Sequence, residues 1–202
     1  MSPLRKIVIT SLTFVVLCLG SVSPAVADPV AIGTWYEFSF TGPGAQARGC
    51  FPADPLGVGC GPSSGTPTTF APAPPWTFTA PAGGATFTVT DAFLIGDAFN
   101  VLDFGVLIGS TPTVAAVGNC GSDPVPCLAN PAVSSGVFNL AAGAHSITIV
   151  ARVAPFGSGA AYFRVDGGGG PAIPEPATMV LLGTGLAGVG AIVRKRRKAN
   201  KG

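Results

Sequence analysis

Apolar and polar residues alternate with a period of two along the middle of the chain. Within residues 86–90, Phe87 and Val89 alternate with three threonines, and the same alternation returns in residues 145–153 and 161–166. Because successive side chains of a strand point to opposite faces, this pattern predicts half-buried antiparallel strands. We expect strands at residues 33–41, 75–80, 85–92, 97–103, 106–109, 136–140, 145–154 and 160–166.

Turns rich in glycine and proline separate these segments, for example at residues 81–84 and 157–159. Short strands at regular spacing, with no helix-period segment between them, are typical of an all-β domain. We therefore expect an antiparallel β-sandwich, jelly-roll-like, over residues 28–166. Two stretches depart from the pattern: the Pro-, Ser- and Thr-rich residues 61–75 predict an extended surface loop, and residues 167–172 predict a glycine-rich spacer.

Composition and charge argue against two classes of protein, a disordered chain and a nucleic-acid-binding domain. Hydrophobic residues make up 48% of the 202 residues and charged residues only 10%, which is too apolar for a disordered chain. The basic residues gather at the two ends. Residues 28–172 carry three arginines against eight acidic residues, a net charge of −5. Because phosphate binding needs clustered Lys and Arg, we expect no nucleic-acid partner.

The first 27 residues have the pattern of a secretory signal peptide. Arg5 and Lys6 precede an apolar run over residues 7–20, and the segment ends in Ala25-Val26-Ala27. A basic start, an apolar middle and a small-x-small end predict cleavage by signal peptidase between Ala27 and Asp28. An uncleaved membrane anchor is the alternative interpretation. Either way, residue 28 onward is expected to be exported.

The C-terminal residues 173–202 consist of three consecutive pieces. A proline-rich stretch contains Pro174, Glu175, Pro176 and Thr178, an apolar run covers residues 177–193, and a basic tail occupies residues 194–202. As a helix, residues 177–193 would rise by about 1.5 Å each to roughly 26 Å, which is short for a hydrocarbon core of about 30 Å. We expect a single transmembrane helix that spans the cytoplasmic membrane with local adjustment. The basic residues should remain cytoplasmic and place the preceding domain outside: Arg194, Lys195, Arg196, Arg197 and Lys198.

These three pieces, in this order, resemble the PEP-CTERM sorting signal of Gram-negative surface proteins. Pro174-Glu175-Pro176 matches the namesake motif, Leu181-Leu182-Gly183 matches the glycine-interrupted helix, and the arginine-rich end completes the pattern. The resemblance covers about 30 of the 202 residues. It implies recognition by exosortase, a membrane enzyme that processes the exported protein near the motif. The alternative from the residues alone is a permanent tail anchor.

Four cysteines remain once the signal peptide is removed: Cys50, Cys60, Cys120 and Cys127. An even number of cysteines in an exported chain predicts disulfides. Three connectivities are possible, and the short separations with Gly and Pro between favour pairing Cys50 with Cys60 and Cys120 with Cys127. Structural zinc is the competing interpretation, but neither separation is of the C-x-x-C type.

Candidate catalytic residues are sparse. His145 is the one histidine, and no serine or aspartate is placed by spacing to complete a triad with it. We expect a turn-proximal imidazole that makes a backbone hydrogen bond. The acidic residues are nearly all aspartates scattered over strand ends and turns, where they bond local backbone, so we expect no enzyme and no cofactor.

Two ligand-binding interpretations remain open. Asp91, Asp97, Asn100 and Asp103 form the best oxygen-rich group for calcium, although no D-x-D-x-D-G loop is present. Four aromatic residues are candidates either for stacking on sugar rings or for filling the core: Trp35, Tyr36, Trp76 and Tyr162.

The middle of the chain also resembles secreted carbohydrate-binding-type sandwiches. The segments 99–106 and 138–149 have the strand-turn-strand pattern of such domains. This fold hosts many unrelated functions, so the resemblance supports fold more than ligand. Together the observations predict an exported cell-surface or extracellular-matrix protein with a structural or adhesive sandwich. The alternative is a carbohydrate-binding module that acts on exopolysaccharide.

Overall fold

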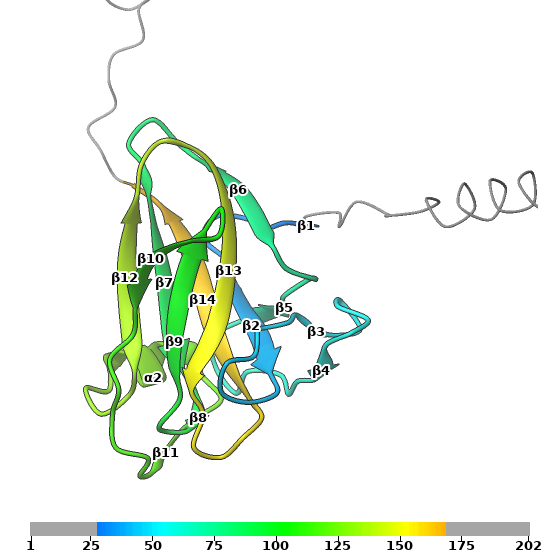
Figure 1. The fold of residues 1–202 in the computed structure, drawn as a ribbon, viewed down its shortest axis with the longest axis vertical. Helices are drawn as coiled ribbons and strands as arrows, with labels where there is room; N and C mark the ends of the chain where they lie inside the picture. Colours follow the sequence, from blue (N-terminus) through cyan, green and yellow to red (C-terminus); the bar gives the residue numbers. More distant parts are fainter. Residues whose placement is uncertain (1–27, 169–202) are drawn as a thin grey trace, which may run out of the picture.

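Each of the eight alternating segments forms a strand in the computed structural model, which describes residues 28–168. Ten strands build two five-stranded sheets that lie face to face (Figure 1). The first sheet has the order β1 (Asp28–Pro29), β6 (Trp76–Ala80), β13 (Gly143–Val153), β9 (Ala98–Asp103) and β10 (Val106–Ser110). The second has the order β12 (Ser135–Leu140), β7 (Ala85–Asp91), β14 (Gly159–Gly167), β2 (Trp35–Phe40) and β5 (Thr68–Phe70). The all-β prediction is confirmed.

The hydrophobic core lies between the two sheets and is dominated by aromatic rings. Phe38 of the second sheet contacts Trp76 and Phe99 of the first sheet, with ring centroids 5.9 and 5.4 Å apart. Phe163, on β14, lies 4.6 Å from Trp76 and 5.2 Å from Phe87. Alternate residues of each strand point inward, as the period of two predicts, and aromatic pairs at these distances stabilise beyond their buried area.

The outer face of the second sheet is also covered. All six residues of β2 are buried, although its sequence alternates. Two segments cover it. One is a small sheet of β3 (Cys50–Phe51) and β4 (Val58–Gly59). The other contains Cys127, which packs on Trp35 and Tyr162 of the sheet in a second apolar cluster. The central strands of this sheet are therefore buried on both faces, which leaves polar side chains in a dry environment.

A short helix was missing from the sequence prediction. Helix α2 (Pro124–Ala129) begins between Cys120 and Cys127 and contains Cys127, in a segment for which we expected no helix. Asp123 caps it by accepting a hydrogen bond from the Val125 N–H, and Pro124 takes the first helical position. Six residues are too few to show a helical period, but Asp followed by Pro is a recognised start signal that would have indicated it.

The prediction of a wholly antiparallel domain was wrong at the edges. The segment expected to be a loop over residues 61–75 contains β5, which pairs with β2 in parallel. Strand β1 pairs with β6 in parallel, and β3 pairs with β4 in parallel. These strands are only two or three residues long, too short to show alternation. A second small sheet joins β8 (Phe93–Leu94) to β11 (Asn119–Gly121).

Several predicted segments fall outside residues 28–168. They are the signal peptide, most of the glycine-rich spacer, the proline-rich motif, the apolar run over residues 177–193 and the basic tail. Strand β14 continues through Gly167, the first residue of the predicted spacer. Within residues 28–168, none of the helical segments has the length and apolar character needed to cross a membrane.

Candidate functional site

Both predicted local disulfides are present, Cys50 to Cys60 and Cys120 to Cys127. The two cross-linked alternatives are thereby excluded. Because each sulfur atom is bonded to another sulfur, none of the four is a thiolate ligand for zinc. Both disulfides lie against the outer face of the second sheet, where they hold covering segments onto β2 and β14.

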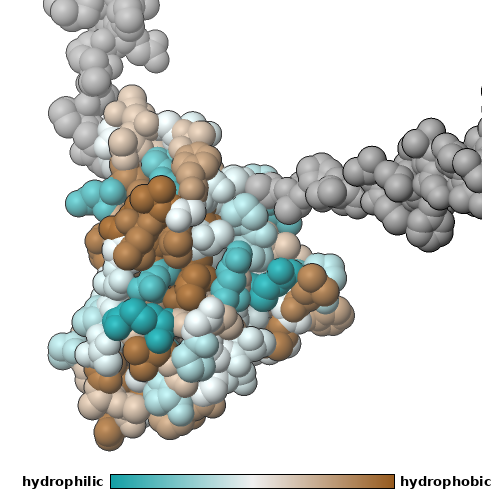
Figure 2. Space-filling view, in the orientation of Figure 1, coloured by the Kyte–Doolittle hydropathy of each residue, from teal (hydrophilic) through white to brown (hydrophobic). Residues whose placement is uncertain are grey.

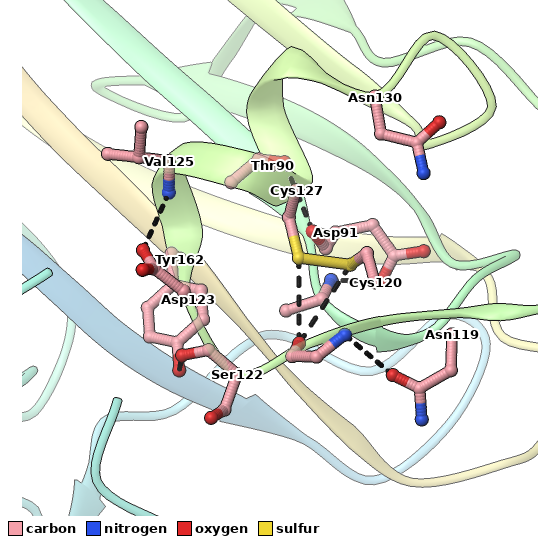
Figure 3. The surroundings of a disulfide bond; sticks show 12 residues. Thr90, Asp91, Asn119, Cys120, Ser122, Asp123, Val125, Cys127, Asn130 and Tyr162 are labelled. Atoms are coloured by element: carbon pink, nitrogen blue, oxygen red, sulfur yellow. Dashed lines mark hydrogen bonds between the residues drawn. A yellow bond between two sulfur atoms is a disulfide. The ribbon is translucent and has the colours of Figure 1, made fainter. Parts of the chain in front are cut away.

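The Cys120–Cys127 disulfide anchors α2 to the sheet (Figure 3). Cys127 is fully buried in the cluster with Trp35 and Tyr162, and the Tyr162 hydroxyl donates to the Ser122 carbonyl oxygen at 2.8 Å. Burial raises the pKa of Tyr162, and the negative charges of Glu37 and Asp123 add to the effect. The tyrosine therefore stays protonated and donating, which suits a structural role.

The Cys50–Cys60 disulfide closes a segment that we call the flap, residues 49–61, which contains β3 and β4. The two halves of the disulfide differ in exposure, since Cys50 is fully buried and Cys60 is only half-buried. Three apolar side chains of the flap are solvent-exposed: Phe51, Leu56 and Val58. The flap therefore presents one sulfur towards solvent and keeps the other against β2.

Asp54 organises the flap. Its carboxylate is fully buried and accepts hydrogen bonds from the Gly49 N–H, the Leu56 N–H and the Arg48 guanidinium, each at 2.9 Å. Burial alone would raise the pKa of this carboxyl, but the hydrogen bonds from Arg48, Leu56 and Gly49 outweigh burial and lower it. Asp54 therefore stays ionised, and its charge fixes the path of the turn.

Glu37 lies beneath the flap, on the outer side of β2. Its side chain is fully buried, and within residues 28–168 neither carboxylate oxygen has a hydrogen-bond partner of good geometry. Burial raises the pKa of Glu37 to about 7, although the nearby Gly61 N–H offsets part of the shift. A carboxylate oxygen and the sulfur atoms of Cys50 and Cys60 all lie within 4.8 Å of one another. Sequence reasoning missed this residue, because no local pattern places Glu37 next to the two cysteines.

The four oxygen-bearing residues considered for calcium do not converge. Asp91 accepts the N–H groups of Ala92, Gly96 and Asp97 at 2.8–3.0 Å and so closes the loop after β7. Asn100 accepts from the Ser110 hydroxyl, and Asp103 pairs with His145.

What remains of that group is a pair of buried acids. Burial raises the pKa of Asp91 to about 6, and burial together with the charge of Asp91 raises that of Asp97 to about 7. Two carboxyls in one loop do not supply the six or more oxygens that calcium takes. The calcium interpretation is therefore not supported by the geometry.

His145 caps one end of the core, and both of its ring nitrogens are engaged. Nδ1 lies 2.7 Å from Oδ2 of Asp103, and Nε2 lies 2.9 Å from the Ala141 carbonyl oxygen. The expected backbone hydrogen bond is confirmed, and the Asp103 contact was not foreseen. Burial lowers the pKa of His145, but hydrogen bonds to Ala141 and Asp103 and the charge of Asp103 outweigh burial and raise it. No ring nitrogen is left to activate a serine, so the arrangement stabilises the strand ends.

A shallow groove of about 550 Å³ opens beside this histidine. Its lining includes Ile32, Thr77, Phe78, Thr79, Phe104 and His145. Apart from His145, the side chains in this set are apolar or hydroxylic, so the groove lacks the convergent polar groups that usually orient a small ligand.

The four aromatic residues considered for sugar stacking are all buried. Exposed fractions are 3% for Trp35, 8% for Tyr36 and 0% for both Trp76 and Tyr162. A sugar platform must present an open ring face to solvent, so these residues fill the interior instead. Trp76, for example, donates its indole N–H to the Pro72 carbonyl oxygen at 2.8 Å and packs on Phe163.

Comparison with known proteins gives one match. Residues 172–197 match the PEP-CTERM protein-sorting motif. No curated protein and no solved structure matches the chain. The match covers the predicted motif Pro174-Glu175-Pro176, the apolar run and most of the basic cluster, all outside the residues that the structure describes. The chain therefore carries a PEP-CTERM sorting signal, which implies that it is exported and processed by exosortase.

Proposed function

We propose that this chain is a cell-surface or extracellular-matrix protein of a Gram-negative bacterium. The observation that carries the proposal is the sorting motif over residues 172–197, close to the C-terminus. In this proposal signal peptidase releases the N-terminus at Asp28, residues 177–193 hold the chain in the cytoplasmic membrane, and exosortase then removes the anchor. The β domain finally resides at the cell surface or in the matrix.

The domain itself is proposed to be structural or adhesive rather than enzymatic. Three features of residues 28–168 support this role. Two disulfides hold covering segments onto one sheet, aromatic rings fill the space between the sheets, and both ring nitrogens of His145 are occupied. Disulfides form and persist in the oxidising environment outside the cell, so covalent cross-links of this kind favour persistence of the fold there.

The surface best suited to adhesion is the free edge of the first sheet, at β10. Figure 2 shows apolar side chains gathered over the part of this face where β9, β10 and β13 lie (compare Figure 1). Phe104, Val106 and Leu107 are 66%, 67% and 55% exposed, and β10 carries no charged residue. An uncharged apolar edge strand is a template for pairing with another strand.

We propose that the partner is a second copy of the same chain. An edge that lacks charge does not repel itself, and two β10 strands can pair around a two-fold axis with the same residues buried on each side. In sedimentation velocity, the released protein should self-associate as its concentration rises. Leu107→Lys should weaken this association at least tenfold, whereas Val137→Lys, at an exposed position of β12, should not. Equal behaviour of the parent and Leu107→Lys would refute pairing through β10.

The sorting proposal is tested by intact-mass spectrometry of membrane and released fractions from native cells. The released parent should begin at Asp28 and lack residues 194–202. Glu175→Gln should remain full length at its C-terminus and stay in the membrane fraction, whereas Asp166→Asn, a charge-matched control within the β domain, should be processed normally. Release of Glu175→Gln with the same mass as the parent, apart from the substitution, would contradict recognition of the motif.

A further inference from the structure

The two disulfides have different chemical surroundings. Figure 3 shows Asp91 next to the Cys120–Cys127 disulfide. Both carboxylate oxygens of Asp91 accept hydrogen bonds from backbone N–H groups. Beside Cys50–Cys60 lies Glu37. Neither of its oxygens has a hydrogen-bond partner of good geometry among the described residues, and the Gly61 N–H offsets only part of the effect of burial. The unsatisfied carboxyl is fully buried, and one of its oxygens is within 4.8 Å of both sulfur atoms. An unpaired buried polar group destabilises a fold, so a buried carboxyl such as that of Glu37 calls for an explanation, for example a redox or catalytic role.

The two sulfur atoms of Cys50–Cys60 differ in accessibility, and this difference indicates which sulfur an external thiolate would attack and which would leave. Cys60 is half-buried at the rim of the flap, so an external thiolate can reach its Sγ. Cys50 is fully buried against β2, so its sulfur would have to leave as a thiolate in a dry environment. A thiolate is poorly stabilised there, and a proton donor next to it would remove the charge. Glu37 is in position to be that donor.

The environment of Cys50 also accommodates the thiol that would form. Its Sγ lies 3.2 Å from the main-chain carbonyl oxygen of Glu37, which can accept a hydrogen bond from the new S–H. Among the titratable and charged groups near Cys50, Glu37 is the one that can supply the proton to its sulfur. The charge of Glu37 raises the pKa of Tyr162 on β14, so this tyrosine stays protonated. Arg48, just before the flap, and Asp54, within it, pair with each other at 2.9 Å.

We propose that Cys50–Cys60 is an exchange site at which an external thiol becomes covalently attached through Cys60, with Glu37 as the proton donor. The thiolate attacks Sγ of Cys60 and forms a new S–S bond, while the Cys50–Cys60 bond breaks and its electron pair moves to Sγ of Cys50. The proton of Glu37 moves to that sulfur. The products are a mixed disulfide at Cys60, a thiol at Cys50 and the Glu37 carboxylate, and the reverse sequence restores the starting state.

The thiol can come from a small molecule or from a polypeptide, since the chemistry at Cys60 is the same. The site is surrounded by three exposed apolar side chains, and these should make the two kinds of thiol react at different rates: Phe51, Leu56 and Val58. They should favour a cysteine in an apolar peptide over glutathione, which is small and charged. The exchange does not depend on adhesion through β10, so either proposal can fail without the other.

The test follows mixed-disulfide formation in the intact released protein by peptide-mapping mass spectrometry. The probes are glutathione and an apolar peptide with one cysteine, each at pH 6.0 to 8.5, with rates divided by thiolate concentration. We expect reaction at Cys60 and not at Cys50, at least tenfold faster than at Cys120–Cys127. The rate per thiolate should fall as the pH rises through about 7, the pKa to which burial raises Glu37.

Glu37→Gln supplies the second readout. It should lower the rate per thiolate at pH 6 by roughly tenfold or more and make the profile flat, because general-acid help of this kind is worth at least that much. Exchange at Cys120–Cys127 in the same sample is the internal control for folding. A rate per thiolate in the unsubstituted protein that is independent of pH, or attachment at Cys50, would overturn the proposal without any variant.

Discussion

The flap carboxylate Asp54 allows a quantitative test of how burial changes an arginine–aspartate pair. Residues 28–168 contain two such pairs with nearly equal distances, Arg48–Asp54 at 2.9 Å and Arg164–Asp166 at 2.8 Å. The arginine side chains are equally exposed, at 33%, but the Asp54 side chain is fully buried and that of Asp166 is 34% exposed. The pairs therefore differ mainly in the burial of the carboxylate and in the N–H groups it serves.

The expected effect of Asp54→Ala follows from the donors that it leaves behind. The buried Gly49 N–H would lose its partner, at a cost of about 1–3 kcal/mol, and the Leu56 N–H would lose a bond worth about 0.5–1.5 kcal/mol. Arg48 is partly exposed and regains water, so its contribution is under about 1 kcal/mol. We expect the free energy of unfolding to fall by about 2–4 kcal/mol in total. For Asp166→Ala we expect a fall of less than about 1 kcal/mol.

The assay is urea unfolding of the released protein with its disulfides intact, with m-values compared between variants. The pH dependence gives a second check. The pKa of Asp54 is lower in the folded protein than the ordinary value of 3.8, so its stabilisation is fully present above that value and is lost as the pH falls through the folded pKa. The difference between parent and Asp54→Ala should shrink below about pH 4. Equal losses for Asp54→Ala and Asp166→Ala at pH 7 would refute the reasoning.

Three further outcomes are expected. Phe163→Ala should lower the free energy of unfolding by about 3–5 kcal/mol in the same urea assay, because its ring packs on several others in the centre of the core; a loss under 1 kcal/mol would contradict that packing. Gly49→Ala should destabilise by about 1–3 kcal/mol, since a Cβ there would overlap the Ala71 carbonyl oxygen, whereas Gly61→Ala, where a Cβ meets open space, is the matched control. In NMR titration, the pKa of His145 should lie above 6.5 and move down in Asp103→Asn, so the stabilisation from this pair is present below pH 6.5 and fades as the pH rises through the folded pKa; an unchanged pKa in Asp103→Asn would show that Asp103 is not the cause.

Local patterns in the sequence determined much of this protein. The period of two at Phe87 and Val89 depends only on the geometry of one strand, so all eight long strands could be predicted from residue order. The separations of Cys50 from Cys60 and of Cys120 from Cys127 favoured the pairings that are present. The sorting motif around Glu175 is linear, and a linear signal is readable without a fold.

Tertiary structure alone decided what depends on contacts between distant segments. Trp76 and Tyr162 could have faced solvent or the core, and only the stacking of two sheets and the covering helix put them inside. Glu37 lies in an ordinary-looking strand, and it becomes a buried acid beside a disulfide only because the flap folds back over β2. Burial and proximity are sums over neighbours far apart in the chain. A residue's chemistry at such a place is therefore set by what covers it, which local sequence does not contain.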